Sequence, residues 1–211
     1  MKRETIANKG IWRKKKMYIL NAWDIEGVRF EQPKLKINGI EAVRSSTPRS
    51  CRDAIKKALE IIMNKNEVDL NEYVVKYRNE FDNLPFEDIA FPRGMNGLDE
   101  YKDNFTIFKP GTPIHTKGAL LFNHLLQHKG ITEIPPIQDG DKIKFIYLRM
   151  PNPINSPVIT VPDDMPDQLG LYNYIDRDKQ FDKAFLDPLR SITDLIGWSI
   201  SQKVTLDSFF E

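Results

Sequence analysis

The cations of residues 13–16 are the side chains in this sequence best placed to bind a charged ligand. Four consecutive cations, "RKKK", run directly into the apolar segment "MYIL" of residues 17–20. Residues 1–57 carry fifteen Lys and Arg against six Asp and Glu, whereas residues 163–211 carry five against ten. Because Lys and Arg neutralise phosphates and release counterions, the basic N-terminal quarter predicts a phosphate-binding surface. A solvated charged face is the alternative that the charge alone leaves open.

The sequence gives less support for a metal site or a catalytic nucleophile. His124 and His128 have helical i, i+4 spacing, but the zinc-protease motif needs Glu directly after the first His, and this chain has Leu125 there. We therefore expect histidines on a helix surface and no metal site. The lone Cys51 cannot form an internal disulfide or a cysteine-based zinc site, and we expect a small core residue. Nucleophile-elbow, Walker A and dinucleotide motifs are missing from the sequence, so no catalytic residue is assigned to this chain.

Two strands are expected to position the cations. Residues 17–24 and 27–37 are rich in β-branched and aromatic residues and flank "IEG", which predicts a hairpin. Since side chains alternate faces along a strand, Lys16 and Tyr18 should share one face, and Lys15 and Met17 the other.

The second strand leads into a predicted anion site. Lys34 and Lys36 should share a face, and Gly39 permits close approach of another backbone. A helix start follows, where hydroxyls, free N–H groups and the helix dipole favour an anion. The residues at this start are Arg44, Ser45, Ser46 and Thr47.

The rest of the chain predicts an α+β fold with several helices and a second strand pair. Thr47 is the expected N-cap of the first helix, with Pro48 in its first turn. The expected helices cover residues 48–66, 69–84, 114–129, 178–192 and 192–200, the strand pair covers 142–150 and 156–162, and residues 92–113 form an irregular connection. Gly130 should end the third helix, and Pro188 should mark a kink or boundary.

The sequence shows no signal for secretion or membrane insertion, and we therefore expect a cytoplasmic protein that does not bind a membrane. No stretch approaches the roughly 20 apolar residues of a membrane span, and "MKRETIANKG" has no apolar core of a signal peptide.

The motifs around these cations resemble a known family. The segment "KKMYILNAWDIEGVRFEQPKLKINGIEAVRSSTP" is similar to the palm-to-thumb region of family B DNA polymerases of T-even-type bacteriophages, which has KKxY, K-x-K-I-x-G-x-E and SSTP in this order. "PIHTKGALLFN", "FDKAFLDPL" and "KVTLDSFFE" resemble a thumb motif, a late helix and a C-terminal clamp-binding peptide of that family. The resemblance thus extends over the whole chain.

The resemblance implies a DNA-binding role for individual residues. The KKxY positions would hold the primer strand near its 3′ end, and the following stretch, the thumb entry, the thumb motif and the late helix would contact the duplex. These residues are Lys15, Lys16, Tyr18, Lys34, Lys36, Gly39, Arg44, Ser45, Ser46, His115, Lys117 and Lys183. Asp187 departs from the family, which tends to have Lys there, and part of this surface is therefore in question.

The resemblance also implies that the functions of the polymerase are divided between two polypeptides. The family's D-x-x-S-L-Y-P, Y-x-D-T-D and K-x-x-x-N-x-x-Y-G motifs, which hold two metal ions and the nucleotide, are missing here, as are the acidic motifs of the proofreading exonuclease. We therefore expect a split polymerase in phage DNA replication, located in the cytoplasm of the infected host cell. A separate N-terminal subunit would supply exonuclease, fingers, palm carboxylates and Mg²⁺, and this chain would be inactive alone.

The C-terminal peptide has two interpretations. Leu206, Phe209 and Phe210 could enter a hydrophobic groove of a sliding clamp from one helical turn, although Lys203 replaces the glutamine that begins many clamp motifs. A terminal helix whose aromatic residues pack on its own domain is the alternative.

The expected domains are the end of the palm with a basic β-hairpin (1–46), a mostly α-helical thumb with the small strand pair (47–202) and the clamp-binding peptide (203–211). The alternative function is a non-catalytic accessory protein that binds DNA and the clamp, and a remnant without activity is a third.

Overall fold

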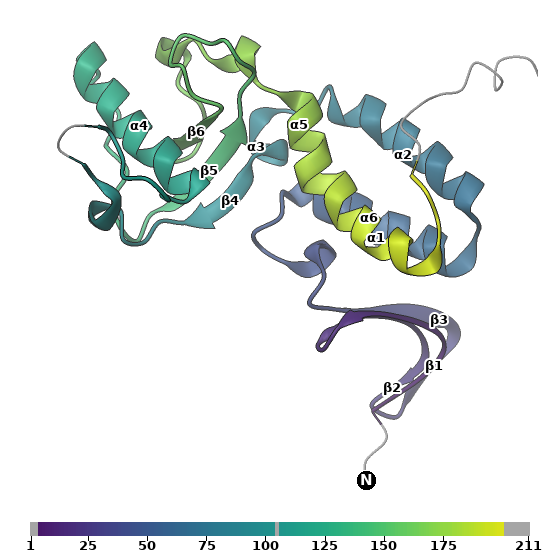
Figure 1. Cartoon of the computed structure of the whole chain (residues 1–211). Helices are drawn as coiled ribbons and strands as arrows, with labels where there is room; N and C mark the ends of the chain where they lie inside the picture. The colour runs from purple at the N-terminus through teal and green to yellow at the C-terminus, as the bar shows by residue number, and fades with distance from the viewer. Residues whose placement is uncertain (1–3, 104–105, 201–211) are drawn as a thin grey trace, which may run out of the picture. The chain divides into compact units, whose positions relative to one another are not determined.

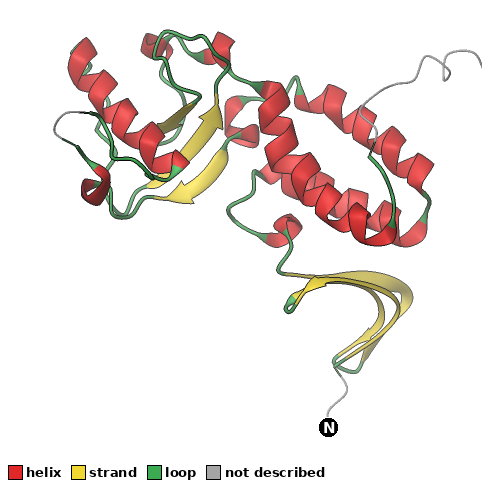
Figure 2. Cartoon of the chain, viewed as in Figure 1, coloured by secondary structure: helices red, strands yellow, loops and turns green. Residues whose placement is uncertain are grey.

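The described part of the chain forms two three-stranded antiparallel sheets and a set of helices (Figures 1 and 2). The computed structural model describes residues 4–103 and 106–200. Contacts divide it into two units, one with residues up to Asn83 and from Phe181 on, the other with Leu84–Gln180. The mixed content of helices and antiparallel sheets confirms the predicted α+β class. The expected boundary between residues 46 and 47 falls inside the first unit, and the assignment of palm and thumb stays a prediction.

The first sheet has one strand more than the sequence predicts. β1 (Thr5–Lys14), β2 (Met17–Ile25) and β3 (Val28–Asn38) pair in the order β1-β2-β3. The predicted pair is confirmed as β2 and β3, with Glu26 and Gly27 in the turn, where the Asp24 carboxylate accepts a hydrogen bond from Gly27 N at 2.8 Å. β1 was missed because its polar residues, cations and Gly10 conceal the strand pattern.

Helices α1 (Arg49–Asn64) and α2 (Glu67–Phe81) confirm the first two predicted helices. The expected N-cap is wrong by one position, since Pro48 caps α1 and Thr47 is buried before it. Aromatic rings from α2 and the C-terminal segment form the core of this unit. The closest ring pairs are Tyr77 with Phe185, at 4.7 Å between centroids, and Phe81 with Phe181, at 5.2 Å.

The last helix changes its winding before Pro188. α5 (Arg177–Phe181) continues into a π-helical turn (Asp182–Leu186), and α6 (Asp187–Thr193) follows with Pro188 in its first turn. A proline cannot donate the backbone hydrogen bond of a regular helix, and the wider π turn directly before it accommodates this loss. The kink or boundary predicted at Pro188 corresponds to this change from π-helical to α-helical winding at Asp187, and the helix continues through Pro188. The second predicted helix is only a 3₁₀ turn (Asp194–Ile196).

The second unit packs one long helix on the other sheet. β4 (Phe91–Gly94), β5 (Lys142–Tyr147) and β6 (Val158–Val161) form this sheet, and α4 (Ile114–Lys129) ends at Gly130 in the left-handed conformation, as predicted. β4 was predicted as irregular because Pro92 and Gly94 lie in it, and both are tolerated because β4 is an edge strand. A short helix α3 (Phe86–Ile89) precedes β4, and 3₁₀ turns of this unit cover Asp99–Tyr101, Asp167–Leu169 and Tyr172–Tyr174. In the first unit, a 3₁₀ turn covers Glu41–Val43.

Gly118 sets the distance between α4 and β6. A Cβ at this position would lie 2.7 Å from the backbone N of Thr160, and the Thr160 hydroxyl donates to the carbonyl of His115 at 2.7 Å. Only glycine therefore lets the helix lie this close to the strand. Across the described residues, no helix is both long and apolar enough to span a membrane.

Candidate nucleic-acid interface

The turn between β1 and β2 carries three exposed cations. Lys14 pairs with Met17 across the hairpin, and Lys15 and Lys16 form the turn between them. Among described residues, no acidic side chain forms an ion pair with Lys14, Lys15 or Lys16. The prediction that Lys16 and Tyr18 share a strand face is wrong, because Lys15 and Lys16 lie in the turn and not in the strand. The turn instead gathers the three ammonium groups at the end of a hairpin.

Gly39 packs against this turn. Its φ of +66° is in the left-handed region, and a Cβ there would collide with the backbone oxygen of Lys16 and lie 3.1 Å from the Cγ of Met17. Arg44 Nε then donates to the Gly39 carbonyl at 2.9 Å. The close approach predicted for Gly39 is thus present inside the chain, where it places the end of β3 against the basic turn.

Lys34 and Lys36 share one face of β3, as predicted. They pair with Ala22 and Leu20, which are two residues apart on β2. The ammonium of Lys36 donates to the Thr5 hydroxyl at 2.8 Å, and the ammonium of Lys34 lies 4.3 Å from the ring centroid of Phe30. Both cations therefore already have partners in the sheet.

The predicted anion site before α1 is only partly open. Glu41 pairs with Arg13 at 3.2 Å and with Arg44 at 3.8 Å, so its carboxylate balances part of their charge. Ser45 is exposed and Ser46 is half-buried. α1 has no side-chain N-cap hydrogen bond and no acidic residue in its first turn. Its positive end therefore adds to the local potential.

Cations on α1 were missed by the sequence analysis. Arg49 and Lys56 are exposed and Arg52 is half-buried, and their i, i+3, i+7 spacing places them on one side of the helix. The acidic Asp53 and Glu60 lie nearby on the same helix and reduce the net charge. The helical spacing of these cations was the signal that could have identified them.

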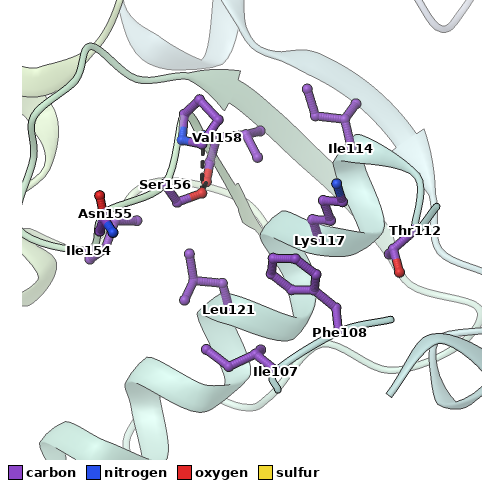
Figure 3. Close-up of a pocket in the computed structure, with 11 residues that line it drawn as sticks. Ile107, Phe108, Thr112, Ile114, Lys117, Leu121, Ile154, Asn155, Ser156 and Val158 are labelled. Carbon is purple, nitrogen blue, oxygen red and sulfur yellow. Dashed lines mark hydrogen bonds between the residues drawn. The ribbon is translucent and has the colours of Figure 1, made fainter. Parts of the chain in front are cut away.

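His115 and Lys117 lie in the second unit, in the first turn of α4. Burial and the neighbouring charge of Arg93 lower the pKa of His115, so its ring is neutral at pH 7 and can donate or accept a hydrogen bond but adds no charge. Lys117 lies 5.4 Å from the ring centroid of Phe108 and lines an open cavity of about 410 Å³ (Figure 3). The cavity is mostly apolar, with Leu121 and Val158 on its walls.

Lys183 is engaged with an acidic neighbour. Its ammonium lies 2.8 Å from a carboxylate oxygen of Asp187, which also pairs with Arg190 at 3.5 Å. Asp187 is the residue at which the sequence predicts a departure from the family that the chain resembles. Its carboxylate would compete directly with any phosphate that approached Lys183.

The remaining predicted residues lie in the core, on the surface of α4 or outside the described residues. Leu206, Phe209 and Phe210 lie outside the described residues. Cys51 is buried, as predicted, and burial raises the pKa of its thiol to about 11 while Tyr77 Oη donates to its Sγ at 3.5 Å. His124 and His128 are exposed on α4, as predicted, with ring centroids 6.0 Å apart. Within the described ranges, no three His, Cys, Asp or Glu side chains are grouped to hold a metal ion.

Two curated proteins match nearly the whole chain. The DNA-directed DNA polymerase of Enterobacteria phage T4 is 31% identical over 206 residues, which is 95% of this chain and 22% of the relative. The DNA-directed DNA polymerase of Escherichia phage RB69 is 32% identical over 206 residues, with 96% and 22% covered. The chain is homologous to these phage DNA polymerases. It spans about a fifth of their length. No family model matches the chain.

Proposed function

We propose that this chain is the C-terminal part of a family B DNA polymerase, made as a subunit that grips the primer–template duplex. The homology to two phage DNA polymerases over at least 95% of the chain carries this proposal. The relatives' remaining length is ample for the exonuclease, palm and fingers. A subunit of this kind needs a positively charged surface for the duplex and no active site of its own.

The basic hairpin turn is the central contact in this proposal. Lys15 and Lys16 bind phosphates of the primer strand near its 3′ end, with Tyr18 on the adjoining strand. Phosphate contacts fix the position of a protein on the duplex without reading its sequence. The exposure of the three turn cations and their lack of described acidic partners support this role. The contact should therefore be equally strong on every primer sequence.

The other proposed contacts extend along the duplex in two groups. Lys34, Lys36, Gly39, Arg44, Ser45, Ser46 and Lys183 belong to the first unit, and His115 and Lys117 to the second. The engagement of Lys36 with Thr5 and of Lys183 with Asp187 means that these two must exchange partners to reach DNA. We expect them to contribute less than the turn.

Catalysis in this proposal belongs to a partner subunit. Family B polymerases use two carboxylates to hold two Mg²⁺ ions that activate the primer hydroxyl and stabilise the leaving group. The described residues of this chain offer no grouped ligands for such ions. We assign the carboxylates, the nucleotide site and the exonuclease to a separate N-terminal polypeptide, here called the catalytic polypeptide. This chain holds and orients the duplex.

Primer extension tests the division of labour. This chain, the catalytic polypeptide and an equimolar mixture are each supplied with Mg²⁺, dNTPs and a labelled primer–template. Extension by the mixture alone is the expected result. Equal extension by the catalytic polypeptide alone would reject the proposal and assign this chain the alternative role of an accessory DNA-binding protein.

The C-terminal peptide is proposed to bind the sliding clamp. Leu206, Phe209 and Phe210 have the spacing that one helical turn presents to a hydrophobic groove. Deletion of residues 203–211 should abolish the increase in processivity that the clamp gives and leave distributive synthesis intact. Clamp-dependent product lengths identical to those of the full chain would contradict this proposal.

A further inference from the structure

One face of the sheet in the second unit carries a group of aromatic rings. Phe91 on β4 pairs with Phe145 on β5, and their rings stack with centroids 4.9 Å apart. Tyr147 meets these two rings edge-on, with its centroid 6.4 Å from Phe91 and 6.1 Å from Phe145. We call these three rings the aromatic cluster. Thr160 pairs with Phe145 and lies against Gly118 of α4, so the cluster is on the α4 side of the sheet (Figure 1).

Arg93 and His115 both contact the aromatic cluster. The guanidinium carbon of Arg93 lies 5.6 Å from the ring centroid of Phe145 and 5.8 Å from that of Phe91. The ring of His115, in the first turn of α4, has its centroid 6.2 Å from that of Phe145. Both side chains therefore lie next to Phe145, although they are 22 residues apart in sequence.

Arg93 is the charged member of this pair. Burial lowers the pKa of Arg93, but a guanidinium stays protonated in proteins. Burial, followed by the charge of Arg93, lowers the pKa of His115, so that its ring is neutral at pH 7. The ammonium of Lys179, 4.9 Å from the ring centroid of Tyr147, adds a second positive charge at the cluster. An anion at this surface would therefore be attracted by Arg93 and Lys179 and not by His115.

The exposure of the cluster favours phosphates over bases as its ligands. Only 9% of Phe91 and 4% of Phe145 is exposed, so these rings cannot stack on unpaired bases as in a single-strand binding surface. Arg93 is half-buried and reaches the surface. One of its N–H groups donates to the Pro92 carbonyl at 2.9 Å, and a guanidinium has five such donors in a planar fork that suits phosphate oxygens.

We propose that Arg93 is the phosphate-binding cation of the duplex contact in the second unit, with His115 beside it as a hydrogen-bond donor. This inference rests on the proposed function, which takes His115 and Lys117 as duplex contacts, and it adds a residue outside the motifs. Lys117 lies over the ring of Phe108, and not over the aromatic cluster. Without Arg93, the contact at His115 would therefore lack a charge of its own.

A purely structural role is the alternative for Arg93. A cation over aromatic rings stabilises a fold without any ligand. The two roles differ in their salt dependence, because only a contact with phosphate releases counterions from the duplex. The slope of log K against log salt concentration therefore identifies the residue that carries the charge of the contact.

Salt-dependent duplex binding by the full chain tests this inference. Affinity for a labelled primer–template duplex is measured by fluorescence anisotropy at 50 and 200 mM salt. Arg93→Met removes the charge while its side chain still covers the rings, and it should weaken binding about five-fold or more at 50 mM salt. Its loss of affinity between the two salt concentrations should be about 3.5-fold smaller than that of wild type.

Three further variants complete this test. His115→Ala should weaken binding and keep the wild-type salt dependence, because it removes a neutral donor. Arg93→Lys keeps the charge and loses the planar fork, so it should keep the wild-type salt dependence and lose less affinity than Arg93→Met. Lys142→Gln is the control, since Lys142 is exposed on β5 and strand alternation places it on the face opposite to Phe145. Its affinity and salt dependence should equal those of wild type.

The outcomes separate this inference from the proposed function. If the wild-type chain binds the duplex and Arg93→Met keeps the wild-type salt dependence, the inference is overturned and the proposed function stands. An equal change of salt dependence in His115→Ala and Arg93→Met would also overturn it, because His115 would then carry charge. A wild-type chain that binds no duplex would reject the proposed function and this inference together.

Discussion

Replacement of Lys16 separates charge from backbone conformation in the basic turn. Lys16 has φ = 64°, and a residue with a side chain loses roughly 1–2 kcal/mol in this left-handed region relative to glycine. Lys16→Gly therefore removes the charge and the strain together, whereas Lys16→Ala removes the charge and keeps the strain. Both variants should weaken duplex binding to a similar extent if the ammonium group is what contacts the phosphate.

The magnitude follows from counterion release. Each lost phosphate contact should reduce the slope of log K against log salt concentration by about 0.9. When salt is raised from 50 to 200 mM, a variant that lacks one contact should lose about 3.5-fold less affinity than wild type. The double variant Lys15→Ala/Lys16→Ala should lose about 12-fold less. Affinity itself should fall by roughly 1 kcal/mol or more per contact, equally on duplexes of different sequence.

Fluorescence anisotropy with labelled primer–template duplexes and the assembled enzyme measures both quantities. Lys76→Ala is the charge-matched control, since the Lys76 side chain is 70% exposed on α2. Wild-type salt slopes in both Lys15→Ala and Lys16→Ala would refute the phosphate contact. Weak binding by Lys16→Ala together with wild-type binding by Lys16→Gly would show that relief of the backbone strain offsets the loss of the charge, so that charge alone does not determine affinity.

Three other perturbations follow from contacts in the two units. Gly118→Val should lower the melting temperature, measured by circular dichroism, because its side chain would overlap Thr160; an unchanged melting temperature would contradict the packing of α4 on β6. Asp187→Asn should strengthen duplex binding and steepen its salt dependence, because it removes the carboxylate that pairs with Lys183, and identical affinity in the variant would remove Lys183 from the interface. The thiol of Cys51 has its pKa raised from 9 to about 11 by burial, so between these pH values the unfolded chain releases a proton that the native chain keeps. The free energy of unfolding should therefore fall by about 1.4 kcal/mol per pH unit in this window, and chemical denaturation should show a smaller fall for Cys51→Ala.

Long amphipathic segments were predicted well from the sequence. The helices α1, α2 and α4 show several turns of apolar spacing, and their ends coincide with recognisable signals such as Gly130. The strands β1 and β4 were missed because local residue preferences oppose them. β1 contains cations and Gly10, and β4 contains Pro92 and Gly94, so their pairing depends on partner strands.

The geometry of the basic turn was less accessible to prediction. The sequence identified Lys15, Lys16 and Gly39, but it placed the two lysines in a strand. Their position in the turn depends on β1, which supplies the other half of the hairpin. The contact of Gly39 with the Lys16 carbonyl joins residues 23 apart in sequence, and local patterns do not encode such a contact.

The course of the chain through its two units has a consequence for folding. Residues 84–180 form the second unit, and Phe181 and Phe185 then return to pack on Tyr77 and Phe81 in the first. The first unit thus cannot complete its aromatic core on the ribosome until the whole intervening unit has been synthesised. Early folding of that unit would shorten the effective loop between the two halves of the core and lower the entropy cost of closing it. The second unit would then act as an internal folding aid for the part of the chain that carries the basic turn.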